Sequence, residues 1–169
     1  MKNTYFLVFI FISSFIFAQE EEKETKHIVT AAFGYTFIPK GTSHNSESKD
    51  GVFVPSVGFD YFYKIKPKWE IGIMTDFEFG EYIIFSENLN RKNAIVVVAV
   101  GSFAITKSLN IFAGGGMEFE QEHSIPIIRL GTEYSFKIKK GWVIAPGIFF
   151  DIKEGYDTWS FSLAFGKEF

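Results

Sequence analysis

The stretch that decides the fold is Trp159-Ser-Phe-Ser-Leu-Ala-Phe-Gly-Lys-Glu-Phe169. Its alternate residues are large and apolar up to Phe165 and again at Phe169, and only Lys167 interrupts the series. The residues between them, from Ser160 to Gly166, are small. Successive side chains of a strand point to opposite faces, so this period of two predicts a β-strand with one apolar face and one small, polar face.

Seven further segments have a comparable length, and six of them show the same alternation. Each spans about ten to thirteen residues, which is enough for a tilted strand to cross a bilayer. The exception is 93–105, which is apolar on both faces, so its facing stays open. The eight expected strands are 27–38, 52–64, 69–80, 93–105, 109–120, 126–137, 142–152 and 159–169.

The connections between these segments alternate in length. Those after the first and third strands, 39–51 and 81–92, are long and polar. We expect 39–51 to be a solvated loop and 81–92 to be a second polar loop, with an extension of the preceding strand beyond the membrane over 82–85 as the alternative. Those after the second, fourth and sixth strands are tight. Short turns at one end and longer loops at the other are typical of outer-membrane barrels. The sequence therefore predicts an all-β fold, an eight-stranded antiparallel up-and-down transmembrane β-barrel.

Aromatic residues support a lipid-facing outer surface. The chain contains 22 Phe, more than the core of so small a domain could accommodate. On the predicted strands the aromatic residues gather towards both ends, which predicts two aromatic girdles around an apolar band. A soluble, lipocalin-like barrel is the alternative, but it would carry polar residues at these outward positions. Pro55 and Pro146 lie within predicted strands, and we expect local bulges there.

The first residues resemble an export signal rather than part of the fold. Residues 1–18 combine Lys2, an apolar run and Ala18 before a cleavage point, so we predict a signal peptide. Residues 19–26 form a charged leader that we expect to be disordered, and 27–169 form the barrel domain. The chain has no cysteine, which excludes disulfides and thiol chemistry, and its net charge of −3 gives no reason to expect nucleic-acid binding.

With these features in place, the chain resembles the small eight-stranded outer-membrane barrels of the outer membrane protein A and X type. The segments 129–134 and 165–169 are similar to pieces of such barrels, and the Phe-rich signal resembles those of Bacteroidetes-type, Gram-negative bacteria. The resemblance implies an outer-membrane location and insertion by the barrel-assembly machinery, which would read Phe161, Phe165 and Phe169. We expect a monomer whose partners are outer-membrane lipid and lipopolysaccharide.

Charged residues fall on the small faces of the predicted strands, which point into the lumen. Because buried charges need partners, we predict a salt-bridge network that fills the lumen. Its carboxylates outnumber its bases, which leaves a cation site as an alternative use. The acids are Asp60, Glu70, Asp76, Glu78, Glu118, Glu120, Glu133 and Asp151, and the bases are Lys64, Arg129 and Lys137.

Hairpin arithmetic places Arg129 at the centre of this network. A hairpin centred between His123 and Ser124 sets Arg129 opposite Glu118, with Glu120 on the diagonal. A turn centred on residue 140 sets the same arginine opposite residue 151, and a turn centred on residue 67 sets residue 64 opposite residue 70. We therefore expect Arg129 to lie between carboxylates from both neighbouring strands.

The leading functional prediction is a non-enzymatic integral outer-membrane barrel with a structural or surface-interaction role through its loops. A narrow cation-preferring channel is one alternative, although Phe62, Phe112 and Phe149 are expected to point inward and an eight-stranded barrel is nearly filled by its side chains.

A lipid-modifying enzyme of the deacylase or acyltransferase type, using His123 and Ser124, is the other alternative. Adjacent loop residues point in different directions, which disfavours a catalytic pair. His44, with acidic residues nearby, is too isolated for a metal site. We therefore predict neither a cofactor nor a bound metal.

Overall fold

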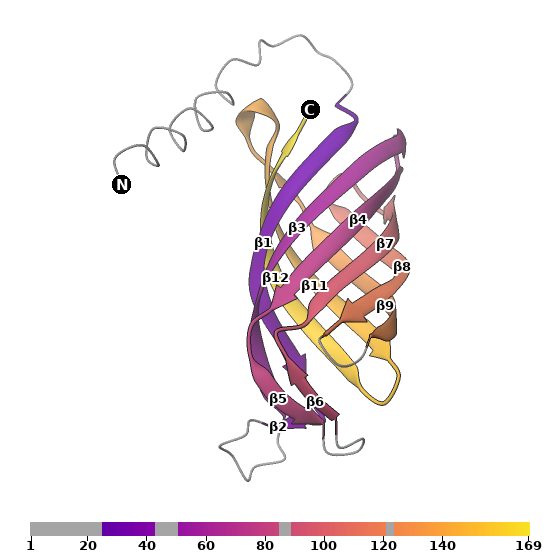
Figure 1. Ribbon diagram of the computed structural model, residues 1–169. Helices are drawn as coiled ribbons and strands as arrows, with labels where there is room; N and C mark the ends of the chain where they lie inside the picture. The colour runs from indigo at the N-terminus through magenta and orange to yellow at the C-terminus, as the bar shows by residue number, and fades with distance from the viewer. Residues whose placement is uncertain (1–24, 43–50, 85–88, 121–123) are drawn as a thin grey trace, which may run out of the picture.

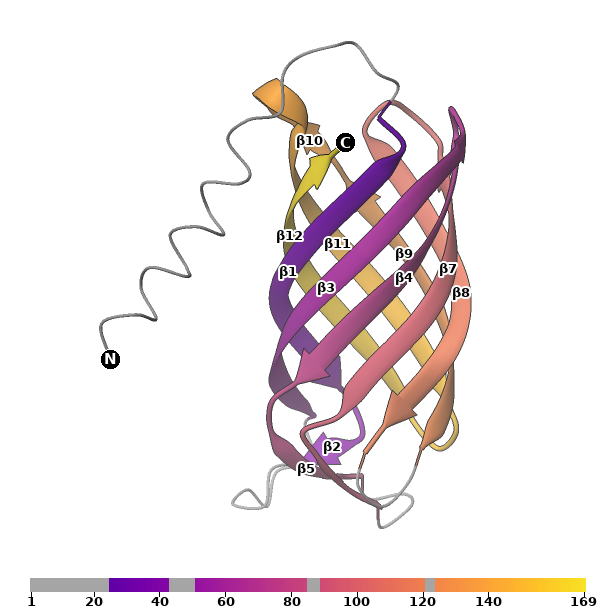
Figure 2. The ribbon, with the colours of Figure 1, turned by 45° about the horizontal axis from the view of Figure 1, so that its top comes forward.

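The computed structural model describes residues 25–42, 51–84, 89–120 and 124–169. Within these ranges, eight long antiparallel strands form a closed barrel (Figures 1 and 2). They are β1 (His27–Ile38), β3 (Val52–Lys66), β4 (Trp69–Glu78), β7 (Ile95–Ala104), β8 (Leu109–Phe119), β9 (Ile125–Tyr134), β11 (Trp142–Lys153) and β12 (Asp157–Glu168). The two-residue strand β10 (Phe136–Lys137) pairs with β11 in the same register as β9.

The barrel closes between its first and last strands. β12 pairs antiparallel with β1 from Ile28↔Glu168 to Phe37↔Trp159, and the other long strands pair with their neighbours along the chain. Closure leaves no long sheet edge with unpaired backbone groups, as a membrane-spanning sheet requires. The predicted eight-stranded up-and-down barrel is therefore confirmed.

Alternation along the strands separates an apolar outer face from a small or polar inner face. In β12, Trp159, Phe161 and Phe165 are exposed, whereas Ser160 and Ala164 are buried. The exposed residues of the whole barrel wall are predominantly large and apolar. A water-facing surface would not carry so many, so the exposures support a lipid-facing wall.

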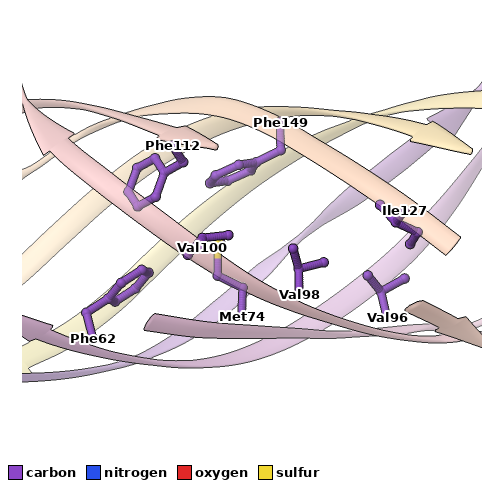
Figure 3. Close-up of a cluster of buried hydrophobic side chains, with 8 residues drawn as sticks. All are labelled: Phe62, Met74, Val96, Val98, Val100, Phe112, Ile127 and Phe149. Carbon is purple, nitrogen blue, oxygen red and sulfur yellow. The ribbon is translucent and has the colours of Figure 1, made fainter. Parts of the chain in front are cut away.

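The facing of β7, which the sequence left open, is decided by the structure. Val96, Val98 and Val100 are buried in the lumen, and Ile95 and Ala99 face outward. The strand is apolar on both sides because the lumen is itself apolar along this wall, where the three valines belong to a buried cluster (Figure 3).

The expected bulges at the two prolines are absent. Pro55 pairs with Tyr35, and Pro146 pairs with Leu163, both without a shift in register. Instead, the ladder on one side begins or ends beside each proline: β4 pairs with β3 only from Ser56, and β9 pairs with β11 only from Gly147. A missing donor costs little where no ladder bond is due, which explains how regular strands tolerate the prolines.

The two ends of the barrel differ. The end we call the turn end carries the tight connections 66–69, 105–108 and 138–141 and both ends of the described chain (Figure 1). In the last of these turns, the 3₁₀ segment Lys139–Gly141, Lys140 and Gly141 have φ values of 63° and 74°, a left-handed backbone that glycine adopts readily. Within the described ranges, no helix is long and apolar enough to cross a membrane.

At the opposite, loop end, parts of the expected loops form a second sheet, and the alternative of strand structure over 82–85 is observed for 82–84. Strands β2 (Gly41–Thr42), β5 (Glu81–Ile84) and β6 (Leu89–Lys92) pair in the order β2-β5-β6 and lie beyond the barrel rim (Figure 1). Tyr82 and Ile84 of this cap sheet are buried against Ile38 and Val54 of the barrel. Apolar side chains within this polar connection therefore pack against the barrel at this end of the lumen.

The centre of the lumen is packed with apolar side chains rather than open. Phe62, Phe112 and Phe149 face one another across it, with ring centroids 5.7 Å apart in each neighbouring pair (Figure 3). Met74 and the β7 valines complete this layer. The inward direction predicted for the three phenylalanines is confirmed, and charged groups lie beside this cluster, since Asp60 and Asp76 are register partners of Met74 and Val96.

Candidate functional site

Arg129 on β9 joins two walls of the barrel. Its Nε and Nη2 donate to the two carboxylate oxygens of Asp151 on β11, at 2.7 and 2.8 Å, and its Nη1 donates to Oδ2 of Asp76 on β4 at 2.7 Å. Its guanidinium carbon also lies 5.6 Å from the ring centroid of Phe149. Arg129 and Asp151 are fully buried. One guanidinium therefore compensates two carboxylates, in the bidentate geometry that gives the strongest such bonds.

A second cluster lies towards the loop end around Glu118 on β8, which has 0% relative exposure. Lys153 at the end of β11 donates to its Oε2 at 2.6 Å, and the Tyr156 hydroxyl donates to its Oε1 at 2.8 Å. Arg91 of the cap sheet donates to Oε1 through Nε at 2.9 Å and also through Nη2. We call Glu118 with these three partners the latch, because it ties the cap sheet to the barrel.

Further acids surround the latch. Oε2 of Glu120 lies 3.4 Å from Nη1 of Arg91, and Glu78 is buried with the Tyr82 hydroxyl 3.5 Å from its carboxylate. Burial raises the pKa of Tyr82 well above its ordinary value, and the nearby Glu78 raises it further. Burial likewise raises the pKa of Tyr156, more than Lys153 lowers it. Both phenols are therefore protonated donors at physiological pH.

The guanidinium of Arg91 is held in its charged form. Burial by itself lowers the pKa of Arg91, but the contact with Glu118 outweighs burial and the net shift is upward. Arg91 has 0% relative exposure although it belongs to a connection predicted to be solvated. An arginine buried this completely is tolerated only because carboxylates meet it.

The hairpin arithmetic was right for one of the two strands beside Arg129. Asp151 is its register partner on β11, as predicted. On β8 the prediction was wrong: Gly114 lies opposite Arg129, and Glu118 lies opposite Ile125. The β8–β9 connection is centred two residues earlier than expected, which moves Glu118 and Glu120 away from Arg129 and leaves them for Arg91.

Charges at the turn end form a smaller group. Lys64 lies opposite Glu70, as predicted, but its Nζ approaches Glu168 at 3.2 Å. Lys137, predicted to point into the lumen, is exposed at the mouth and also pairs with Glu168, at 3.1 Å. These residues, with Glu133, line a cavity of about 790 Å³ that the aromatic layer closes from below.

Neutral groups donate the hydrogen bonds to Asp60. Oγ1 of Thr30 donates to its Oδ2 at 3.0 Å, and the backbone N–H of Thr75 donates to its Oδ1 at 3.2 Å. The predicted charged lumen thus consists of separate clusters around Arg129, Glu118 and Glu168. In the part of the chain that the structure describes, no group of three or more His, Cys, Asp or Glu residues is arranged to hold a metal ion.

Sequence reasoning missed three of the residues that organise the loop end: Arg91, Lys153 and Tyr156. All three were assigned to loops. One signal was not used, namely that Arg91 is one of only two arginines in the chain, and a second, the apolar run at 82–84, indicated only added strand structure. Neither signal identifies Glu118 as the partner.

Comparison with solved structures finds small outer-membrane barrels that share this fold. Neisserial surface protein A superposes with a TM-score of 0.56 at 10% identity, covering 85% of this chain and 97% of that one. Ail, the attachment invasion locus protein of Yersinia pestis, superposes at 0.51 with 11% identity, covering 87% and 100%. Ail in complex with the heparin analogue sucrose octasulfate gives 0.53 at 12% identity, covering 85% and 99%.

At these identities the likenesses show the fold alone. No protein-family model matches the chain, and no curated protein matches its sequence. The proposed kinship with the outer membrane protein A and X type therefore rests on the shared architecture.

The enzyme alternative gains no support. His123 lies outside the described residues, and Ser124 is exposed at the start of β9. Glu118, one of the acids named with this pair, contacts two cations and a phenol. The isolated loop residues around His44 also lie outside the described residues.

Proposed function

We propose that the protein is a non-enzymatic, monomeric outer-membrane barrel with a closed lumen, which presents its loop end at the cell surface in a structural or surface-interaction role. The observation that carries the proposal is the cap sheet, which folds over one end of the lumen and is tied down by the latch. An aromatic layer and the Arg129 cluster lie beneath it. Such a barrel supports a surface but offers no wide path through it.

The cap sheet offers polar groups for contacts outside the cell. Asn90 and Lys92 of β6 and Glu81 of β5 are exposed, and Lys92 and Glu81 pair at 3.5 Å. Among the structural neighbours, Ail has been solved with a heparin analogue. At 12% identity that ligand does not transfer to this chain, so we propose the surface and leave its ligand open.

Delivery to the membrane is part of the proposal. A signal peptide over 1–18 would direct export, and Phe161, Phe165 and Phe169 on the outer face of the closing strand would be read by the barrel-assembly machinery. The outward-facing aromatic residues of the wall would then contact lipopolysaccharide or phospholipid.

The orientation can be tested by cysteine labelling, because the chain has no cysteine of its own. Asn90→Cys on the cap sheet should react with a membrane-impermeant maleimide on intact cells. Lys107→Cys, in a turn at the opposite end, should react only after the outer membrane has been permeabilised. Both positions are exposed, so burial does not bias the comparison. Labelling of Lys107→Cys alone on intact cells would reverse the proposed orientation and refute the surface role of the cap sheet.

Conductance separates the closed barrel from a narrow channel. We expect the protein to give no stable conductance steps in planar bilayers at either polarity of the applied voltage. The reason is that aromatic side chains and clusters of paired charged side chains fill the lumen. Arg91→Ala, which removes the cap-sheet side of the latch, should leave the bilayer silent as well, since the aromatic layer and the Arg129 cluster remain. Regular cation-selective steps from the unaltered protein would establish the channel and contradict the closed lumen.

A further inference from the structure

An apolar groove crosses the outer wall of the barrel near the turn end. Its volume is about 490 Å³, and it runs over β3, β4 and β7. Tyr61 and Tyr63 form one side, Ile71 and Ile73 form the middle, and Ala99 and Gly101 lie at the other side. Tyr61, Ile71 and Ile73 are each at least 43% exposed, so the groove is open to whatever surrounds the wall.

The groove exists because large outward residues stand beside small ones. In the register of β4 and β7, Ile71 lies opposite Gly101 and Ile73 lies opposite Ala99. A Cβ on Gly101 would meet only the carbonyl oxygen of Ala113, at 3.9 Å, so this glycine has open space in front of it. The depression therefore belongs to the outer surface and does not arise from a packing defect in the lumen.

Two basic turns, whose lysines also line the lumen cavity at the turn end, follow the groove along its strands. Two residues beyond Ile71, Trp69 and Phe103 are register partners, and their ring centroids lie 4.8 Å apart. Beyond this aromatic pair are the turns that carry Lys66, Lys68 and Lys107, all of them exposed. Trp residues favour the boundary between hydrocarbon and head groups, which places the groove in the hydrocarbon and the lysines at head-group depth.

We propose that this groove is a binding site for an anionic glycerophospholipid of the periplasmic leaflet, whose acyl chain lies along Ile71, Ala99 and Gly101 and whose phosphate meets Lys66, Lys68 and Lys107. The proposal rests on the membrane orientation given above, in which the tight turns face the periplasm.

Charge complementarity selects the occupant. A hydrocarbon groove gives little preference among lipids, because lipid tails are as apolar as the wall they contact. Discrimination must come from the head group, and clustered lysines beside a membrane favour anionic over zwitterionic lipids. Lipopolysaccharide also carries phosphates, but it belongs to the leaflet at the loop end, whereas the lysines are at the turn end.

The test measures retained lipid by native mass spectrometry of the protein released from nanodiscs. The nanodiscs contain phosphatidylglycerol and phosphatidylcholine with the same acyl chains. We expect phosphatidylglycerol to be retained about tenfold in preference to phosphatidylcholine, and the Lys66→Gln/Lys68→Gln variant to lose that preference. Gly101→Leu, which fills the groove, should reduce the retention of both lipids. Ala99→Leu replaces it if the leucine at 101 prevents folding.

Matched controls isolate the site. Lys139→Gln/Lys140→Gln removes two exposed lysines from a different turn, and Gly115→Leu fills another outward glycine whose Cβ would meet only the Ile127 carbonyl, at 3.6 Å. Both controls should retain phosphatidylglycerol like the unaltered protein. Heat-modifiable gel migration confirms insertion of every variant, so a chain that fails to form a membrane barrel is recognised separately from a barrel without a lipid site.

Three outcomes would overturn the proposal. The first is equal retention of the two lipids by the unaltered protein. The second is loss of phosphatidylglycerol in the lysine variant together with full retention in Gly101→Leu, which would move the lipid to the mouth of the lumen cavity that the same lysines line. The third is displacement of phosphatidylglycerol by added lipopolysaccharide at equal concentration, which would assign the site to the other lipid class.

Discussion

Glu118→Gln is expected to destabilise the barrel by at least about 3 kcal/mol, because it removes the carboxylate that contacts two buried cations, while Glu120 remains near Arg91. Arg91 and Lys153 both have 0% side-chain exposure, and both contact the Glu118 carboxylate. The amide keeps the shape of the side chain and removes its charge. The free energy of unfolding, from urea titrations in phospholipid vesicles followed by tryptophan fluorescence, measures the loss.

The matched control is Glu81→Gln, which makes the same chemical change in an exposed ion pair. Glu81 and Lys92 have side-chain exposures of 41% and 58%, and such pairs contribute about 0–1 kcal/mol. Equal effects of the two substitutions would show that the latch is solvated and would contradict its assignment as a buried cluster.

A triple variant separates the cost of an unpaired buried charge from the cost of lost side-chain packing. When Glu118, Arg91 and Lys153 are all replaced by methionine, both cations are removed together with the carboxylate between them, and the acids Glu120 and Glu78 lose a nearby cation. Because a buried acid can become neutral by taking up a proton, whereas an arginine cannot lose one, we expect a smaller loss than for Glu118→Gln alone. Hydrogen exchange of the β5 and β6 amides should rise in Glu118→Gln and remain slow in the triple variant. A larger loss in the triple variant would indicate that the latch contributes mainly through its hydrogen bonds.

Arg129→Ala is the second substitution with a large expected effect, again at least about 3 kcal/mol. It leaves Asp151 and Asp76 in the lumen without the guanidinium that contacts both of them, at 2.7 Å each. Arg129→Lys should recover only part of the loss, because an ammonium group cannot bind both oxygens of Asp151 in the planar geometry of the guanidinium. The same urea titrations apply.

Rescue provides the control for this prediction. Adding Asp151→Asn and Asp76→Asn to Arg129→Ala removes the unpaired charges, so the triple variant should be more stable than Arg129→Ala alone. Arg129→Met tests the volume of the side chain and should be nearly as damaging as alanine. A neutral Arg129→Ala would mean that water reaches the two carboxylates, and the lumen would then not be closed at this depth.

The strands and their faces could be predicted because their causes are local. The period of two in 159–165 depends only on neighbouring residues. The same local alternation predicted a strand over 27–38, which is the range of β1. The register across tight turns was predictable as well: the short connection around Lys140 allows few alignments, and Arg129 lies opposite Asp151 as a result. Between β8 and β9 the predicted register was wrong, because the predicted centre of the hairpin lies two residues later than the centre given by the observed pairs.

The barrel, its strand directions and the apolar outer face of its wall follow from local patterns in the sequence, because side-chain alternation and short turns act over a few residues. By contrast, the packing of residues 81–84 and 89–92 as a cap depends on contacts between residues that are far apart in the chain. Arg91 and Glu118 are 27 residues apart, and Lys153 is 35 residues beyond Glu118. Burial of these charges is favourable only when all of them meet, and no local pattern records which distant residues will compensate a buried charge.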